Sequence, residues 1–174
     1  MKLSYLVRGL PGHPLHPPLT DATVGIYTFA MLAALSDVLG ITNNVGAQGW
    51  WLALIAGLIT TLFTALTGFA DWLTISWGSQ LWRTATWHMI VMLSATVFFA
   101  AAALFGHDEF LAGNVRADGF VLTLIGFAVL SVGGWLGGAL VYVHGMRVLN
   151  LVDEPAERAV SPVPHAEKET AERS

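Results

Sequence analysis

Residues 50–73 have the sequence WWLALIAGLITTLFTALTGFADWL, and this stretch decides the fold. Its one charged residue, Asp71, stands close to its end. A helix needs about 20 predominantly apolar residues to cross a hydrocarbon core of roughly 30 Å. In lipid every backbone polar group must also be hydrogen-bonded internally, which a helix achieves by itself. Residues 50–73 therefore predict a transmembrane helix.

Three further stretches have the same character, so the chain has four predicted spans. They cover residues of about 21–39, 50–73, 87–105 and 119–142. They lack the alternation of strands and exceed the roughly ten residues of a strand in a membrane barrel. The predicted fold class is all-α, a four-helix transmembrane bundle with a disordered C-terminal tail. Trp50 and Trp51 are expected in the aromatic belt at the membrane interface.

Composition supports one membrane domain and excludes other classes of protein. The 174 residues are 55% hydrophobic and 11% charged, against about 25% charged residues in soluble domains. Without cysteine the chain has no disulfide and no iron–sulfur cluster held by thiolates. Its net charge of −4 comes largely from the tail and does not indicate nucleic-acid binding. Residues 1–152 are predicted to form the membrane domain, and residues 153–174 the disordered polar tail.

Basic residues near the spans predict the orientation. One end of the bundle, which carries both termini, has Lys2, Arg8, Arg83 and Arg147. The other end has Arg116, in the second of two expected polar loops, 41–49 and 107–118. Because Lys and Arg accumulate on the cytoplasmic side of membrane proteins, both termini are expected in the cytoplasm.

Connectivity places four histidines at the end that carries the termini. His13 and His16 precede the first span, His88 opens the third, and His144 follows the fourth. Neutral imidazole suits iron, copper and zinc, and ligand sites in bundles are built from side chains on facing helices. His13, His16, His88 and His144 are therefore the candidate ligands of haem b or a transition metal. Alternatively, these histidines only cap helix ends and hydrogen-bond to carbonyls.

The segment 12–18, GHPLHPP, precedes the first predicted span. Its prolines are expected to prevent regular helix and to give a stiff, extended entry into the bundle. Asp21 would then cap the first helix by accepting from free backbone N–H groups.

Asp71 stands at the C-terminal end of the second span, where the helix dipole disfavours a carboxylate. It therefore needs a partner, for which His88, His16 and Arg83 are the candidates. A carboxylate that contacts an imidazole orients it toward a metal, so Asp71 and Asp21 are the candidate orienting residues.

Three motifs together resemble a known family. They are G-H-P-L-H-P-P-L-T-D-A-T-V-G-I-Y-T (12–28), T-G-F-A-D-W (67–72) followed by His88, and G-G-W-L-G-G-A-L-V-Y (133–142). Over residues of about 9–150 the chain resembles the bacterial membrane family catalogued as domain of unknown function 2231. The resemblance implies a four-helix domain in the bacterial plasma membrane and indicates His13, His16, Asp21, Asp71 and His88. Many relatives have a histidine where this chain has Ala139, so His144 is the candidate replacement.

Some relatives are fused to, or encoded beside, Rieske iron–sulfur or cytochrome modules, which implies a redox setting. The resulting hypothesis is an electron-transfer subunit with haem b or a metal at the histidine cluster. Its expected partners are the lipid bilayer and a Rieske or cytochrome protein, and a homo-oligomer stays open. The alternative is a non-redox scaffold or small carrier whose polar cluster is structural. Hydrolase motifs are absent, and whether the protein is an enzyme stays open.

Overall fold

The structure is a computed structural model that describes residues 4–42 and 44–163. Four long helices dominate it: α2 (His16–Val38), α3 (Asn44–Trp72), α4 (Gln80–Phe105) and α6 (Ala117–Tyr142). Each is long and apolar enough to cross a membrane, which confirms the predicted four-span, all-α bundle. The short elements are α1 (Ser4–Arg8), β1 (Gly9–Leu10), β2 (His13–Pro14), α5 (His107–Ala112) and α7 (Ala156–Ala159).

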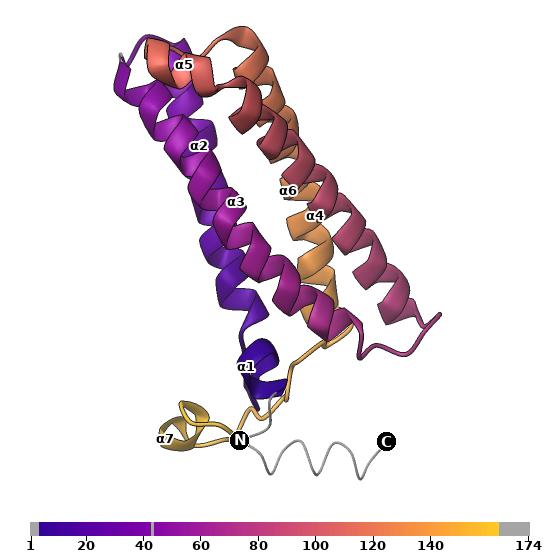
Figure 1. Cartoon of the computed structure of the whole chain (residues 1–174). Helices are drawn as coiled ribbons and strands as arrows, with labels where there is room; N and C mark the ends of the chain where they lie inside the picture. Colours follow the sequence, from indigo (N-terminus) through magenta and orange to yellow (C-terminus); the bar gives the residue numbers. More distant parts are fainter. Residues whose placement is uncertain (1–3, 43, 164–174) are drawn as a thin grey trace.

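The two short strands pair antiparallel, with Gly9 opposite Pro14. Figure 1 shows α1 and α7 at one end of the bundle and α5 at the other. Of the predicted tail, α7 belongs to the described part, whereas residues 164–174 lie outside the described residues.

The first span begins earlier than its prolines suggested. Helix α2 starts at His16 and has proline in its first turn. The first N–H groups of a helix have no partner within it, so proline is tolerated there, and its fixed φ suits the helix. The entry expected to be extended over residues 12–18 is therefore extended only before the helix, at His13–Pro14 in β2, and the expectation is wrong from His16 onward. Asp21 is an exposed residue inside α2 and does not cap the helix.

The third span also begins before its predicted boundary at residue 87. Helix α4 starts at Gln80, because the Ser79 side chain accepts a hydrogen bond from the backbone N–H of Trp82 at 3.1 Å. A serine in this position satisfies one of the free donors of the first turn. Residues 80–86, which precede the predicted span, therefore belong to the same helix as the span.

The long helices form two antiparallel pairs, α2 with α3 and α4 with α6 (Figure 1). Tyr27 of α2 stacks on Phe99 of α4, with ring centroids 3.8 Å apart and planes 7° apart. The two rings are almost fully buried and join the pairs. Around them the core is built from small and aromatic side chains, among them Ala30, Ala34, Trp50, Leu54, Ala95 and Leu130.

Large apolar side chains cover the outside of the bundle. Leu62, Val97 and Trp135 are 59%, 67% and 83% exposed, and many similar residues accompany them. A water-soluble monomer rarely exposes contiguous apolar area of this extent. The surface suits a bundle surrounded by hydrocarbon, which solvates apolar side chains and leaves the backbone to the helices.

Two carboxylates close the end of the bundle at α5. The Asp37 oxygens accept from the backbone N–H groups of Ala47 at 3.1 Å and Val115 at 2.7 Å. Glu109, 1% exposed, accepts from the backbone N–H of Arg116 at 2.7 Å. Residues 107–118, expected to be a polar loop, thus form a folded cap that includes α5.

Trp50 lies in the core and not in the interfacial belt, which corrects the expectation for this residue. It is fully buried, and its indole N–H donates to Thr123 Oγ1 at 2.8 Å. Gly106 and Gly119 make room for it, since a Cβ at either position would collide with the indole ring. A buried tryptophan usually finds such a partner for its N–H group.

Candidate functional site

A cavity of about 330 Å³ lies between the two helix pairs. Side chains of α2, α3, α4 and α6 line it, and most of them are apolar. Its polar lining residues include His16, His88, Asp71 and several threonines. The volume is within the range of about 300–1,000 Å³ that small-molecule sites occupy. This cavity is the candidate functional site.

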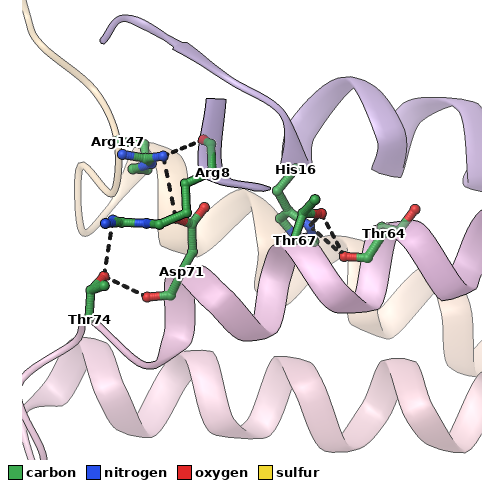
Figure 2. A network of polar contacts seen from close by, with 7 residues as sticks. All are labelled: Arg8, His16, Thr64, Thr67, Asp71, Thr74 and Arg147. Atoms are coloured by element: carbon green, nitrogen blue, oxygen red, sulfur yellow. Dashed lines mark hydrogen bonds and ion pairs between the residues drawn. The ribbon is translucent and has the colours of Figure 1, made fainter. Parts of the chain in front are cut away.

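His16, the first residue of α2, faces α3. Its Nδ1 lies 3.0 Å from the carbonyl oxygen of Thr64 and 3.3 Å from Thr67 Oγ1 (Figure 2). The ring packs over Gly68, where a Cβ would come within 2.6 Å of the imidazole Cε1. A residue larger than glycine at position 68 would therefore displace the imidazole.

His88 has the corresponding arrangement in the other helix pair. Its Nδ1 lies 2.8 Å from the carbonyl oxygen of Gly133 in α6. Its ring packs over Gly137, one turn further along α6, where a Cβ would be 3.1 Å from Cε1. Two glycines of the motif at 133–142, Gly133 and Gly137, thus contact the imidazole of His88 in α4.

The carbonyl partners determine which ring nitrogen carries the proton. A carbonyl oxygen can only accept, so Nδ1 of each histidine carries the hydrogen. In the neutral imidazole, Nε2 then has a free lone pair. In the described part of the chain, neither Nε2 has a hydrogen-bond partner. This is the arrangement in which a histidine ligates a metal, because the bond at Nδ1 fixes the ring and raises its basicity.

The structure brings two of the four candidate histidines to the cavity. His13 is exposed in β2, and its Nδ1 is 3.4 Å from the carbonyl oxygen of Pro11. His144 follows α6, and its Nε2 is 3.1 Å from Thr84 Oγ1. Neither residue lines the cavity. His16 and His88 therefore form the site, and the other two lie at the same end of the bundle outside it.

Asp71 is 3% exposed and has arginine partners instead of the expected ones. Arg8 Nε donates to Asp71 Oδ1 at 2.9 Å, and Arg147 Nη2 lies 3.4 Å from the same oxygen (Figure 2). The expectation that Asp71 pairs with His88, His16 or Arg83 is therefore wrong. Asp71 borders the cavity without a hydrogen bond to either histidine, and Asp21 does not line it. The burial of Asp71 indicates that this carboxylate needs a positively charged partner, but it does not indicate which residues provide it.

The donor set limits the metals that fit. Among the residues that the structure describes, no group of three His, Cys, Asp or Glu side chains comes together as a metal site. A bare zinc ion usually takes three or four protein ligands. Haem needs only axial ligands from the protein, because the porphyrin supplies the other nitrogens. Two imidazoles beside an apolar cavity therefore fit haem better than a bare ion.

The fold and the cavity define the class: an integral membrane protein with four helical spans and a ligand-sized cavity between two helix pairs. The chain belongs to the family described as predicted membrane protein (DUF2231), whose model matches residues 12–150. The match contains all four spans and both histidines, and it confirms the family resemblance. No curated protein and no solved structure matches the chain.

Proposed function

We propose that the protein is an electron-transfer subunit of the bacterial plasma membrane that binds haem b through His16 and His88. One observation carries the proposal. Each helix pair contributes one imidazole to the same apolar cavity, with Nδ1–H bound to a backbone carbonyl and Nε2 free. Paired ligands from facing helices are the usual way in which a bundle holds a cofactor.

Haem b, when bound, would supply one-electron chemistry. The residues of the chain would orient its ligands and tune its reduction potential. The carbonyls of Thr64 and Gly133 hold the two imidazoles by their Nδ1–H groups and leave Nε2 of each ring free. The lining, which includes Tyr27, Phe99 and Met92, gives the site a mostly apolar surrounding. Hydrogen bonds to axial histidines and a low-dielectric surrounding are the means by which proteins tune haem potentials.

The membrane orientation and the redox partner complete the proposal. Arg8, Arg83 and Arg147 stand toward the end that carries the termini and Arg116 toward the other, which supports cytoplasmic termini. His16 and Asp71 lie toward the same end, so a Rieske or cytochrome partner would exchange electrons there. Because the chain has no cysteine, a single cysteine introduced at Ser161 can be tested for labelling before and after the membrane is permeabilised. The cysteine at Ser161 would label only after permeabilisation, and one at Ser94 within α4 serves as the membrane-buried control.

A visible absorption spectrum of the purified full chain tests the haem site. Protein made with haem available should show a Soret band that shifts when dithionite is added. His16→Ala and His88→Ala should each weaken or abolish that band. His13→Ala and His144→Ala are the matched controls, because both residues lie at the same end outside the cavity, and they should retain it.

Folding of the histidine variants is checked separately by their elution in detergent. His88→Met adds a second check, because an axial thioether raises the reduction potential of a haem iron and keeps it coordinated. A colourless wild-type protein that does not bind added haem would overturn the proposal and leave a structural role for the polar cluster. Loss of the band in the control variants alone would overturn the assignment of His16 and His88.

A further inference from the structure

Two arginines converge on one buried carboxylate at the end of the cavity. Arg8 comes from α1, Arg147 follows α6, and Asp71 lies in the last turn of α3 (Figure 2). Arg8 Nη2 also donates to Thr74 Oγ1 at 3.2 Å, and Arg147 Nη2 donates to the backbone carbonyl of Arg8. The N-terminal segment, the end of α3 and the segment after α6 are thereby tied together.

Arg8, Arg147 and Asp71 together carry a net positive charge. Two guanidinium groups face the single carboxylate of Asp71, so the three side chains carry a net charge of +1. The Nε of Arg147 is buried and has no hydrogen-bond partner within the described residues. The side chains of Arg8 and Arg147 are 30% and 25% exposed, so they remain accessible to a further anion. A guanidinium has five N–H donors, and those two use only some of them.

The backbone holds Arg147 in its position. Its φ of 64° lies in the left-handed region, which a residue with a side chain adopts only at an energetic cost. A backbone held in this way usually marks a site where the surrounding structure requires a particular placement. Here the placement brings the guanidinium to Asp71.

The arginines stand beside the candidate haem site. Asp71 lines the cavity, as does Met146, the neighbour of Arg147. Asp71 is one helical turn beyond Thr67, which is 3.3 Å from the imidazole of His16. The cavity thus has an apolar body and two imidazoles, and Asp71 at its end is paired with the two arginines that lie just outside its lining.

From this juxtaposition we infer that the ligand of the cavity carries carboxylates and that Arg8 and Arg147 bind them. The inference rests on the proposed function and names the anionic partner of these arginines as the propionates of haem b. A bare metal cation would be repelled by the surplus charge, and a neutral molecule would leave it uncompensated. Arginine and carboxylate form charge-assisted, often bidentate hydrogen bonds, which also fix the orientation of the bound group.

The ligand can be varied without changing the protein. The apoprotein in detergent is titrated with iron protoporphyrin IX and with its dimethyl ester, whose propionates carry no charge, and the Soret band is recorded. The wild type should bind the free acid about tenfold more tightly or better, as expected for hydrogen bonds to charged groups. Arg8→Gln and Arg147→Gln should reduce this ratio, and Arg147→Lys should retain part of it. Arg83→Gln, at an exposed residue, is the control and should leave the ratio unchanged.

The outcomes separate this inference from the proposed function. Equal affinity of the wild type for the free acid and the ester would overturn the role of the arginines and leave ligation by His16 and His88 intact. Binding of neither porphyrin would overturn both. Since the comparison of ligands uses the wild type, it stays decisive even where an arginine variant does not fold.

Discussion

Nδ1 of His88 in α4 lies 2.8 Å from the carbonyl oxygen of Gly133 in α6. His16 in α2 makes the equivalent contact, 3.0 Å, with the carbonyl oxygen of Thr64 in α3. Each helix pair therefore orients one imidazole with the backbone of the partner helix. Ligands placed on rigid helices in this way keep their geometry better than ligands on loops.

Gly68→Ala should weaken the proposed haem binding because it moves His16. The new Cβ would lie 2.6 Å from Cε1 of the imidazole, so the ring must shift away from the Thr64 carbonyl. Loss of such a supporting contact typically costs about 10–100-fold in affinity. Titration with haem, followed at the Soret band, measures the effect. Gly134→Ala is the control, since nothing lies within 4 Å of its Cβ. Equal affinity in both variants would contradict the prediction.

Asp71→Asn should destabilise the bundle because it leaves two arginines without their counter-charge. We expect a loss of about 1–3 kcal/mol in the free energy of unfolding, since the carboxylate is buried and the arginines are partly exposed. Unfolding with SDS in detergent micelles measures it. Asp118→Asn breaks the exposed pair with Arg116 and should cost less than about 1 kcal/mol. A similar loss in the two variants would show that the Asp71 cluster does not tie the bundle together.

The fold could be predicted because the membrane imposes a simple rule. Residues 50–73 must form a helix in lipid, and the other three spans follow by the same reasoning. The starts of the helices could not be predicted equally well. The prolines after His16 and the cap by Ser79 act on the first turn, where a residue that ends a helix elsewhere can begin one.

The histidines of the cavity, but not the arginines beside it, were among the predicted site residues. His16 and His88 follow from connectivity, which places the ends of the spans together. The contact of Arg8 with Asp71 joins residues 63 positions apart. That of Arg147 depends on a left-handed backbone conformation after α6, which no local pattern in the sequence indicates. In the sequence these arginines served only to predict the orientation of the chain.

Thr123→Val should destabilise the end of the bundle near α5. It would leave the fully buried indole N–H of Trp50 without its acceptor, the Oγ1 at 2.8 Å. An unsatisfied buried donor costs about 1–3 kcal/mol. Unfolding with SDS again measures the change. Ser131→Ala is the control because its exposed hydroxyl bonds only to a carbonyl of its own helix. Equal stability of the two variants would contradict a structural role for the Trp50–Thr123 bond.

Glu109 should make the stability of the protein depend on pH. Burial raises the pKa of its carboxyl group above the ordinary 4.5, and the hydrogen bond from the Arg116 N–H opposes that rise. Asp118 adds to the rise, and the Arg116 charge counteracts it. Within the described residues, Oε1 has no hydrogen-bond partner. The folded state therefore binds this proton more tightly than the unfolded state does, which stabilises it at low pH.

This contribution is complete below the unfolded-state pKa and is lost as the pH rises through the folded-state pKa. Glu109→Gln cannot ionise, so its free energy of unfolding should lack this loss, and the stability of the variant relative to the wild type should increase as the pH rises above about 4.5. SDS unfolding over that range measures the difference. Glu157→Gln, at an exposed acid in α7, should follow the wild type at every pH. If the difference between Glu109→Gln and the wild type stayed constant with pH, the Glu109 carboxyl would titrate alike in the folded and unfolded states, and its burial would not perturb it.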